Sequence, residues 1–90
     1  MLIVWDEAKR SLNLAKHGID FADLAADFDF ERAISSPAKP SATGRARVAL
    51  IGRHRDRSIV VVVASPLGTE ALSLVSARPA SPRERGHYGL

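Results

Sequence analysis

The hydrophobic pattern changes its period halfway along this chain of 90 residues. Before residue 35, apolar residues recur every three or four positions, which is typical of amphipathic helices. After residue 44 they form short continuous or alternating runs rich in valine, which are typical of strands. Helices followed by a run of strands predict an α+β fold in which the helices pack on one face of an antiparallel sheet.

Two helices are expected in the first half, after a short apolar run over residues 2–5 that is consistent with a strand. Asp6 is a suitable N-cap for a helix over residues 7–17, and Gly18 is suited to end it. Asp20 can cap a second helix over residues 21–28. Spacings of three and four residues predict the buried stripes Ala8, Leu12, Ala15 and Ile19 on the first helix, and Phe21, Leu24, Ala25 and Phe28 on the second.

The second half predicts an antiparallel meander and a C-terminal helix. Residues 35–44 include two prolines, three serines and a glycine, a composition typical of a loop. Strands are expected over residues 47–51, 58–64 and 69–77, joined by a basic turn at 53–57 and a second turn at 66–68. Ser81 and Pro82 favour the start of a helix over residues 82–88. The sheet therefore has three to four strands, and residues 1–90 are expected to form a single domain.

Basic charge is concentrated in the second half of the chain. Residues 1–44 carry 5 Lys/Arg and 7 Asp/Glu, so their formal charge is 5 − 7 = −2. Residues 45–90 carry 8 arginines and 3 acidic residues, so their formal charge is 8 − 3 = +5. Arginine suits phosphate recognition because its planar guanidinium forms paired hydrogen bonds. This half points to nucleic acid or another polyanion, with a solvated basic face as the alternative.

Several classes of protein are not expected. The chain has no cysteine, which excludes disulfides, thiolate metal sites and a cysteine nucleophile. Its longest apolar run, residues 59–64, is too short to span a bilayer, and the N-terminus does not resemble a signal peptide, so a cytoplasmic location is expected. The acidic residues of the basic half are well separated in sequence, so neither a metal nor another cofactor is expected.

Ordered motifs extend over nearly the whole chain. They are Trp-Asp-Glu-Ala-Lys at 5–9, Ala-Lys-His-Gly-Ile at 15–19 followed by Asp20-Phe21, Arg-Val-Ala-Leu-Ile-Gly at 47–52, Ser-Ala-Arg at 76–78, and Arg-Glu-Arg at 83–85 with Tyr88. Together they resemble the BrnT toxins, the DUF497 group, which share the RelE-like ribonuclease fold. One departure is Ala46, where that family commonly has an acidic residue before the strand arginine.

The resemblance implies a ribonuclease toxin of a type II toxin–antitoxin system that cleaves RNA and blocks translation. It also implies neutralisation by a BrnA-like antitoxin, a ribbon-helix-helix protein, through which the complex would bind operator DNA. Composition and periodicity do not by themselves lead to these partners.

Metal-free RNA cleavage needs proton-transfer groups and cations. The 2′-hydroxyl attacks the neighbouring phosphate, so its proton must be removed, the departing oxygen protonated and the phosphorane charge stabilised. The resemblance to the BrnT toxins implies that Lys16 contacts phosphate and that His17 transfers the proton. The alternative, without that resemblance, is that both cations complement the negative C-terminal end of the helix dipole. Arg47 and Arg78 are expected at one sheet edge, converging on one phosphate. A structural pairing of Arg78 with Glu84, or with an acid of the second helix, is the alternative.

A second set of residues is predicted to bind RNA without taking part in cleavage. The basic turn can hold the RNA backbone by charge alone. The C-terminal tyrosine can stack on a base, with packing of its ring against the sheet as the alternative. The set comprises Arg53, His54, Arg55, Arg57 and Tyr88.

Two other functions stay open at this point. A catalytically degenerate toxin would bind its antitoxin or RNA without cutting, and Ala46 favours this alternative. A DNA-binding protein is permitted by the basic half, but no predicted helix carries several basic residues in the manner of a recognition helix.

Overall fold

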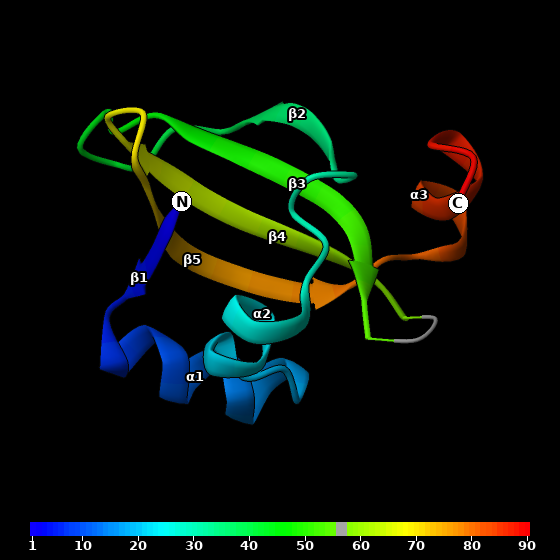
Figure 1. The fold of residues 1–90 in the computed structure, drawn as a ribbon, viewed down its shortest axis with the longest axis horizontal. Helices are drawn as coiled ribbons and strands as arrows, with labels where there is room; N and C mark the ends of the chain where they lie inside the picture. Colours follow the sequence, from blue (N-terminus) through cyan, green and yellow to red (C-terminus); the bar gives the residue numbers. More distant parts are fainter. Residues whose placement is uncertain (56–57) are drawn as a thin grey trace.

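The computed structural model describes residues 1–55 and 58–90, which are organised around a five-stranded sheet (Figure 1). In chain order the elements are β1 (Leu2–Trp5), α1 (Glu7–His17), α2 (Phe21–Asp27), β2 (Ile34–Ala38), β3 (Arg47–His54), β4 (Ser58–Leu67), β5 (Ala71–Pro79) and α3 (Pro82–His87). The α+β class, both N-terminal helices and the C-terminal helix are as predicted.

The sheet is mixed rather than antiparallel. Its strands lie in the order β1-β5-β4-β3-β2. The neighbours from β2 to β5 are antiparallel, but β1 pairs with β5 in parallel. The prediction of a purely antiparallel sheet of three to four strands was therefore wrong, because periodicity identifies strands without fixing their partners.

β2 was missed because its composition is that of a loop. It lies at the edge of the sheet, where it pairs with β3 and Pro37 is opposite Val48. An edge strand tolerates proline because one of its sides makes no ladder hydrogen bonds. The loop predicted over residues 35–44 therefore begins only after Ala38.

Gly52 lies inside β3 instead of ending it. A Cβ at this position would lie 3.2 Å from the Phe28 ring and 3.2 Å from the Cβ of Ala33. Glycine thus permits the close approach of the segment after α2. The strand continues to His54, so the first two residues of the turn expected at 53–57 belong to β3.

A β-bulge changes which side chains of β5 face the main core. The register against β4 shifts between Val63 and Ala64, so β5 has an extra residue between Leu74 and Ser76. As a result Ala77, rather than Ser76, is buried in the main core together with Leu74.

The main core lies between the sheet and α2. Phe21 and Leu24 of α2 have no exposed surface and pack with Phe28 and with strand residues such as Val62. Three of the four residues predicted to be buried on this helix are in the core, whereas Ala25 is exposed.

A smaller cluster lies on the opposite face of the sheet. Ile51, Ile59 and Val61 form it, and Tyr88, which follows α3, packs against them. Because side chains alternate along a strand, this face is the reverse of the one that α2 covers. The prediction that all helices pack on one face was wrong. Packing of the Tyr88 ring against the sheet, which was the alternative interpretation, is what the structure shows.

α1 turns a polar side toward the sheet. Its bounds and its caps, Asp6 and Gly18, are those predicted. However, Leu12 is 71% exposed, and Ala8 and Ala15 of the predicted buried stripe are also exposed. The prediction for this helix face was wrong.

The buried side chain of α1 is that of Asn13, not one of the predicted apolar stripe. Its Oδ1 accepts a hydrogen bond from the Ala77 N–H at 2.9 Å, and its Nδ2 donates to the Ile19 carbonyl at 3.0 Å. Beyond Leu74, β5 has no strand on this side among the described residues, because β1 ends at Trp5. The amide of Asn13 therefore satisfies an N–H that a neighbouring strand would otherwise satisfy.

Candidate functional site

A hollow of about 280 Å³, here called the α1 hollow, lies between α1 and β5. Its lining residues are Lys9, Leu12, Asn13, Lys16, His17, Val75 and Ser76. Lys16 and His17, which were predicted to act together, form the last turn of α1 and both line it. Lys9 was missed as a site residue, although its spacing from Lys16, two helical turns, places both on one side of the helix.

The α1 hollow combines groups suited to phosphate chemistry. Lys16 is exposed and His17 is half-buried. Imidazole exchanges protons near neutral pH, and an ammonium group stabilises phosphate charge. The hydrogen bonds of Asn13 hold α1 against β5 and thereby fix where these side chains stand.

Arg78 of β5 is held by a carboxylate of α3. Its Nη1 and Nη2 donate to the two oxygens of Glu84 at 2.6 and 2.7 Å. Glu84 also accepts from the Ser81 N–H at 2.9 Å, while Ser81 Oγ accepts from the Glu84 N–H at 3.1 Å, a capping box that starts α3. The hydrogen bonds from Arg78 are the main reason that the pKa of Glu84 falls to about 2. The structural pairing considered as the alternative for Arg78 is therefore present.

Arg47 and Arg78 do not meet at one edge. β3 and β5 are both antiparallel to β4, so they run parallel to each other, and Arg47 starts one while Arg78 is near the end of the other. Arg78 is paired with Val61 of β4, and Val61 is paired with Ile51 of β3. Ile51 lies four residues after Arg47 on β3. This offset is about 13 Å along the strands and about 10 Å across them. The expectation that the two arginines lie at one sheet edge was wrong, although both belong to the face that carries α3.

The predicted basic turn is divided between a strand end and a turn. Arg53 is exposed at the end of β3, and His54 is 8% exposed beside it. Arg55 has a φ of 59° and forms ion pairs with Asp23 at 3.0 Å and Asp27 at 3.6 Å. The fourth cation of this predicted set, residue 57, lies outside the described residues.

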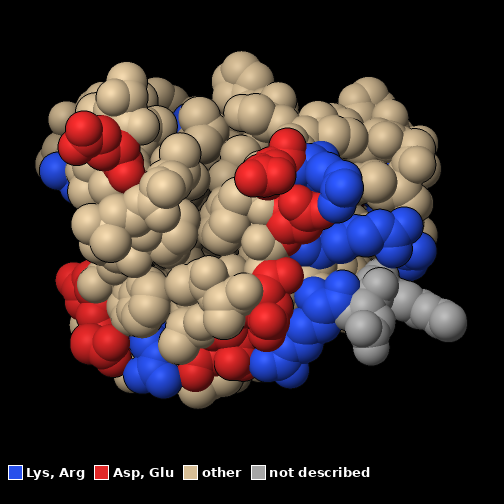
Figure 2. All heavy atoms as spheres, in the orientation of Figure 1, with Lys and Arg blue, Asp and Glu red and all other residues tan. Residues whose placement is uncertain are grey.

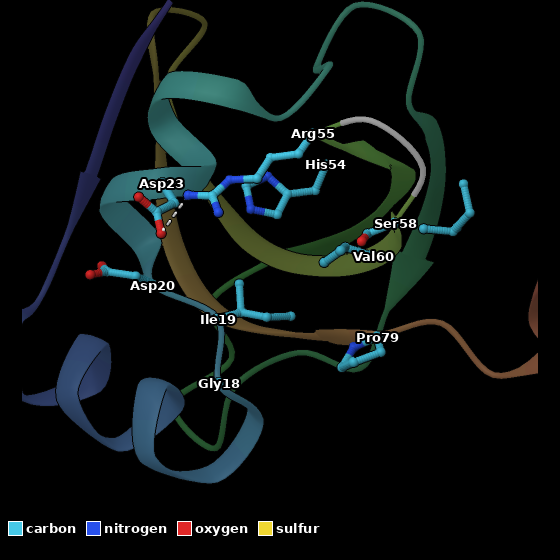
Figure 3. Close-up of a pocket in the computed structure, with 10 residues that line it drawn as sticks. Gly18, Ile19, Asp20, Asp23, His54, Arg55, Ser58, Val60 and Pro79 are labelled. Atoms are coloured by element: carbon cyan, nitrogen blue, oxygen red, sulfur yellow. Dashed lines mark ion pairs between the residues drawn. The ribbon is translucent and has the colours of Figure 1, made fainter.

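A second hollow, of about 250 Å³ and here called the His54 hollow, lies beyond the end of α1 (Figure 3). Its lining residues are Gly18, Ile19, Asp20, Asp23, His54, Arg55, Ser58, Ile59, Val60 and Pro79. His54 Nδ1 is buried and has no hydrogen-bond partner in the described part of the chain. Burial, and then the charge of Arg55, lowers the pKa of His54. In Figure 3 the Asp23–Arg55 ion pair and the His54 ring lie together at one end of the hollow.

The face covered by α1 and α2 is mixed in charge. Acidic and basic side chains lie side by side on it (Figure 2). Ion pairs match several of them, including Arg10 with Asp20 at 2.7 Å and Arg32 with Asp29 at 3.1 Å. This face is therefore not a continuous basic surface.

Within residues 1–55 and 58–90, no three His, Asp or Glu side chains are placed to share a metal ion. In the same ranges, no helix combines the length and the apolar character that crossing a membrane requires.

Comparison with known proteins was made on both sequence and fold. The family model of the BrnT ribonuclease toxin of type II toxin–antitoxin systems matches residues 5–84. The 1.1 Å crystal structure of the Brucella abortus ribonuclease toxin BrnT is 46% identical, with a TM-score of 0.75 over 90% of this chain and 97% of that one. A search of curated proteins found no significant match. With its motifs, its fold and these matches in agreement, the chain belongs to the BrnT family of ribonuclease toxins of type II toxin–antitoxin systems.

Proposed function

We propose that this chain is a metal-independent endoribonuclease whose active centre is the α1 hollow. The observation that carries the proposal is that His17 lines one hollow together with Lys9 and Lys16. Membership of a ribonuclease toxin family supports RNA as the substrate. The lining offers a proton acceptor and cations, which are the groups that metal-free cleavage requires.

In the proposed reaction, His17 removes the proton of an RNA 2′-hydroxyl. The 2′-oxygen attacks the adjacent phosphorus, the bond from phosphorus to the 5′-oxygen breaks, and that oxygen takes a proton from water. The products are a 2′,3′-cyclic phosphate and a 5′-hydroxyl, while the imidazolium returns its proton to solvent. Lys16 and Lys9 stabilise the charge that develops on the non-bridging oxygens.

RNA would continue from the α1 hollow onto the sheet face that carries α3. Arg78 lies two residues after Ser76, a lining residue of the hollow, and so about 7 Å farther along the same side of β5. Arg47, two strands away, would contact a different phosphate. Arg53 and Tyr88 belong to the same face and would contact the RNA at its periphery.

We also propose the partners that such a toxin requires. A BrnA-like ribbon-helix-helix antitoxin would neutralise the chain, and the joint complex would bind operator DNA through the antitoxin. The free toxin would cleave RNA in the cytoplasm and so inhibit translation. The family supports the pairing with an antitoxin. Co-expression with the product of the adjacent gene, followed by co-purification and an operator-binding assay, tests it.

The catalytic proposal is tested by incubating the purified full chain with RNA in EDTA. Cleavage should persist and should leave 2′,3′-cyclic phosphate ends. His17→Ala should lower the rate by about 10²-fold or more, which is the usual contribution of a proton-transfer group. His87→Ala is the matched control. His87 is the exposed last residue of α3 and does not line the α1 hollow, so the cleavage rate of this variant should equal that of the wild type.

A non-catalytic binding module is the second candidate. Two observations favour it: Ala46 precedes β3 where the family resemblance leads one to expect an acid, and the charge of Arg78 is matched by Glu84. RNA that binds the chain but stays intact under the same conditions would establish this alternative.

A further inference from the structure

We propose that the His54 hollow is a base-recognition subsite that selects guanine in the RNA bound at the α1 hollow. The inference deepens the proposed ribonuclease function and rests on it. The volume of about 250 Å³ is below the roughly 300 Å³ at which pockets for drug-sized ligands begin, and so suits a single base. Ile19, Val60 and Pro79 supply apolar walls for the faces of a planar ring.

Two polar side chains of the hollow present an acceptor beside a donor, while the carboxylate of Asp20, which also lines it, is already paired with Arg10 and the Ala22 N–H. Arg55 Nη2 lies 3.0 Å from Asp23 Oδ2, and both side chains line the hollow (Figure 3). The Asp23 side chain is 48% exposed and that of Arg55 is 58% exposed, so both can accept a ligand without unfolding. Their remaining lone pairs and N–H groups are therefore available at one edge of an inserted base.

Guanine is the base whose edges match this arrangement. Its N1–H and N2–H groups together suit a carboxylate, and its O6 and N7 acceptors suit a guanidinium. Adenine and cytosine offer one amino group beside ring acceptors, and uracil offers one N–H between two carbonyls. Asp23 would therefore accept from N1–H and N2–H, while Arg55 would donate to O6 or N7.

His54 is a buried residue that lines the subsite. The residue is 8% exposed, it lines the hollow, and its Nδ1 has no hydrogen-bond partner among the described residues. A buried polar nitrogen without a partner is costly, so a ligand that supplies one gains affinity. Burial and the charge of Arg55 lower the pKa of His54, which favours the neutral form of its ring.

The two hollows are close enough to serve one RNA. His17 lines the α1 hollow and the next residue, Gly18, lines the His54 hollow. On β5, Ser76 lines the first and Pro79 lines the second, a separation of about 10 Å along the strand. A base in the His54 hollow would thus belong to a nucleotide near the phosphate that is cleaved.

The test measures binding to RNA that cannot be cut. Fluorescent 2′-O-methyl tetranucleotides, UUXU with X as G, inosine, A, C or U, lack the 2′-hydroxyl, and their affinity for the full chain is measured by anisotropy. The G oligonucleotide should bind about tenfold more tightly than the inosine one, which lacks the N2 amino group. Asp23→Asn should reduce this ratio to within about twofold.

Asp27→Asn is the matched control. Asp27 also pairs with Arg55, at 3.6 Å, but does not line the hollow, so this variant makes the same charge change and should keep the preference for guanine. Equal affinities for all five oligonucleotides, preference for another base, or a guanine preference that survives Asp23→Asn would overturn the proposal. Cleavage of unmodified RNA in EDTA is scored separately. A chain that cuts RNA but binds all bases equally lacks the subsite, and one that selects guanine without cutting retains it.

Discussion

Replacing Asn13 by alanine should destabilise this protein more than the same change at Leu12, its larger and more hydrophobic neighbour. Asn13 is 6% exposed and forms hydrogen bonds at 2.9 Å with the Ala77 N–H and at 3.0 Å with the Ile19 carbonyl. Leu12 is 71% exposed, although it lines the α1 hollow. The order of the two effects is the reverse of what hydrophobic periodicity predicts.

The size of the effect follows from the groups left without partners. Ala77 has no exposed surface, so its N–H would lose its acceptor in a dry environment. A buried donor without a partner costs about 1–3 kcal/mol, and the lost bond to Ile19 adds about 1 kcal/mol, giving roughly 2–4 kcal/mol. A domain of this size is stable by about 5–13 kcal/mol. Each kcal/mol shifts the Tm by about 4–8 °C, so the Tm should fall by roughly 10–30 °C.

Urea denaturation followed by far-ultraviolet circular dichroism measures these free energies of unfolding. Leu12→Ala should change the value by no more than about 0.5 kcal/mol, as exposed substitutions usually do. Asn13→Asp should also be destabilising, because the carboxylate can accept from Ala77 but cannot donate to Ile19. A greater loss for Leu12→Ala than for Asn13→Ala would refute the placement of α1 described here.

Three further outcomes are expected. The Arg78–Glu84 ion pair is partly exposed and should add about 1 kcal/mol to the free energy of unfolding at neutral pH. The pKa of Glu84 is about 2, against an ordinary value of 4.5. Wild type and Glu84→Gln should therefore differ in stability above pH 4.5, and their stabilities should converge as the pH falls through 2. The imidazole of His54 should titrate below its ordinary pKa of 6.5, so stability should fall as the pH drops below that value; an NMR midpoint at or above 6.5 contradicts this. Lys9→Ala and Lys16→Ala should each reduce the salt dependence of single-stranded RNA binding by about 0.7 in the log–log slope, and unchanged slopes would remove both lysines from the phosphate contacts.

The helix ends were predictable because their signals are local. Asp6 accepts from the Ala8 N–H, Asp20 accepts from the Ala22 N–H, and Ser81 caps α3, each within three residues of the capping side chain. Such contacts depend little on the rest of the fold. The strands β3 to β5 were also found, with errors of a few residues at their ends.

The errors concern contacts between segments distant in the sequence. Asn13 is buried because it meets Ala77, 64 residues away, at a strand edge that periodicity cannot locate. Arg47 and Arg78 were placed together in error, because in an antiparallel meander the first and third strands run parallel, so the start of one and the end of the other lie at opposite ends of the sheet. The pairing of Lys16 with His17 in one hollow was predictable because the two residues are adjacent on one helix, whereas the His54 hollow joins the α1–α2 turn to strands far along the chain.

The shared carboxylate of Glu84 restricts the movement of Arg78. Glu84 Oε1 accepts from both Arg78 and the Ser81 N–H, so the guanidinium and the first turn of α3 are immobilised together. A side chain that is already ordered loses little rotational entropy when a ligand arrives, and that loss is about 0.5–1.5 kcal/mol for a free long side chain. Any shortening of the chain that removes α3 would therefore release Arg78 from Glu84, which frees the guanidinium charge but leaves the side chain without a fixed position.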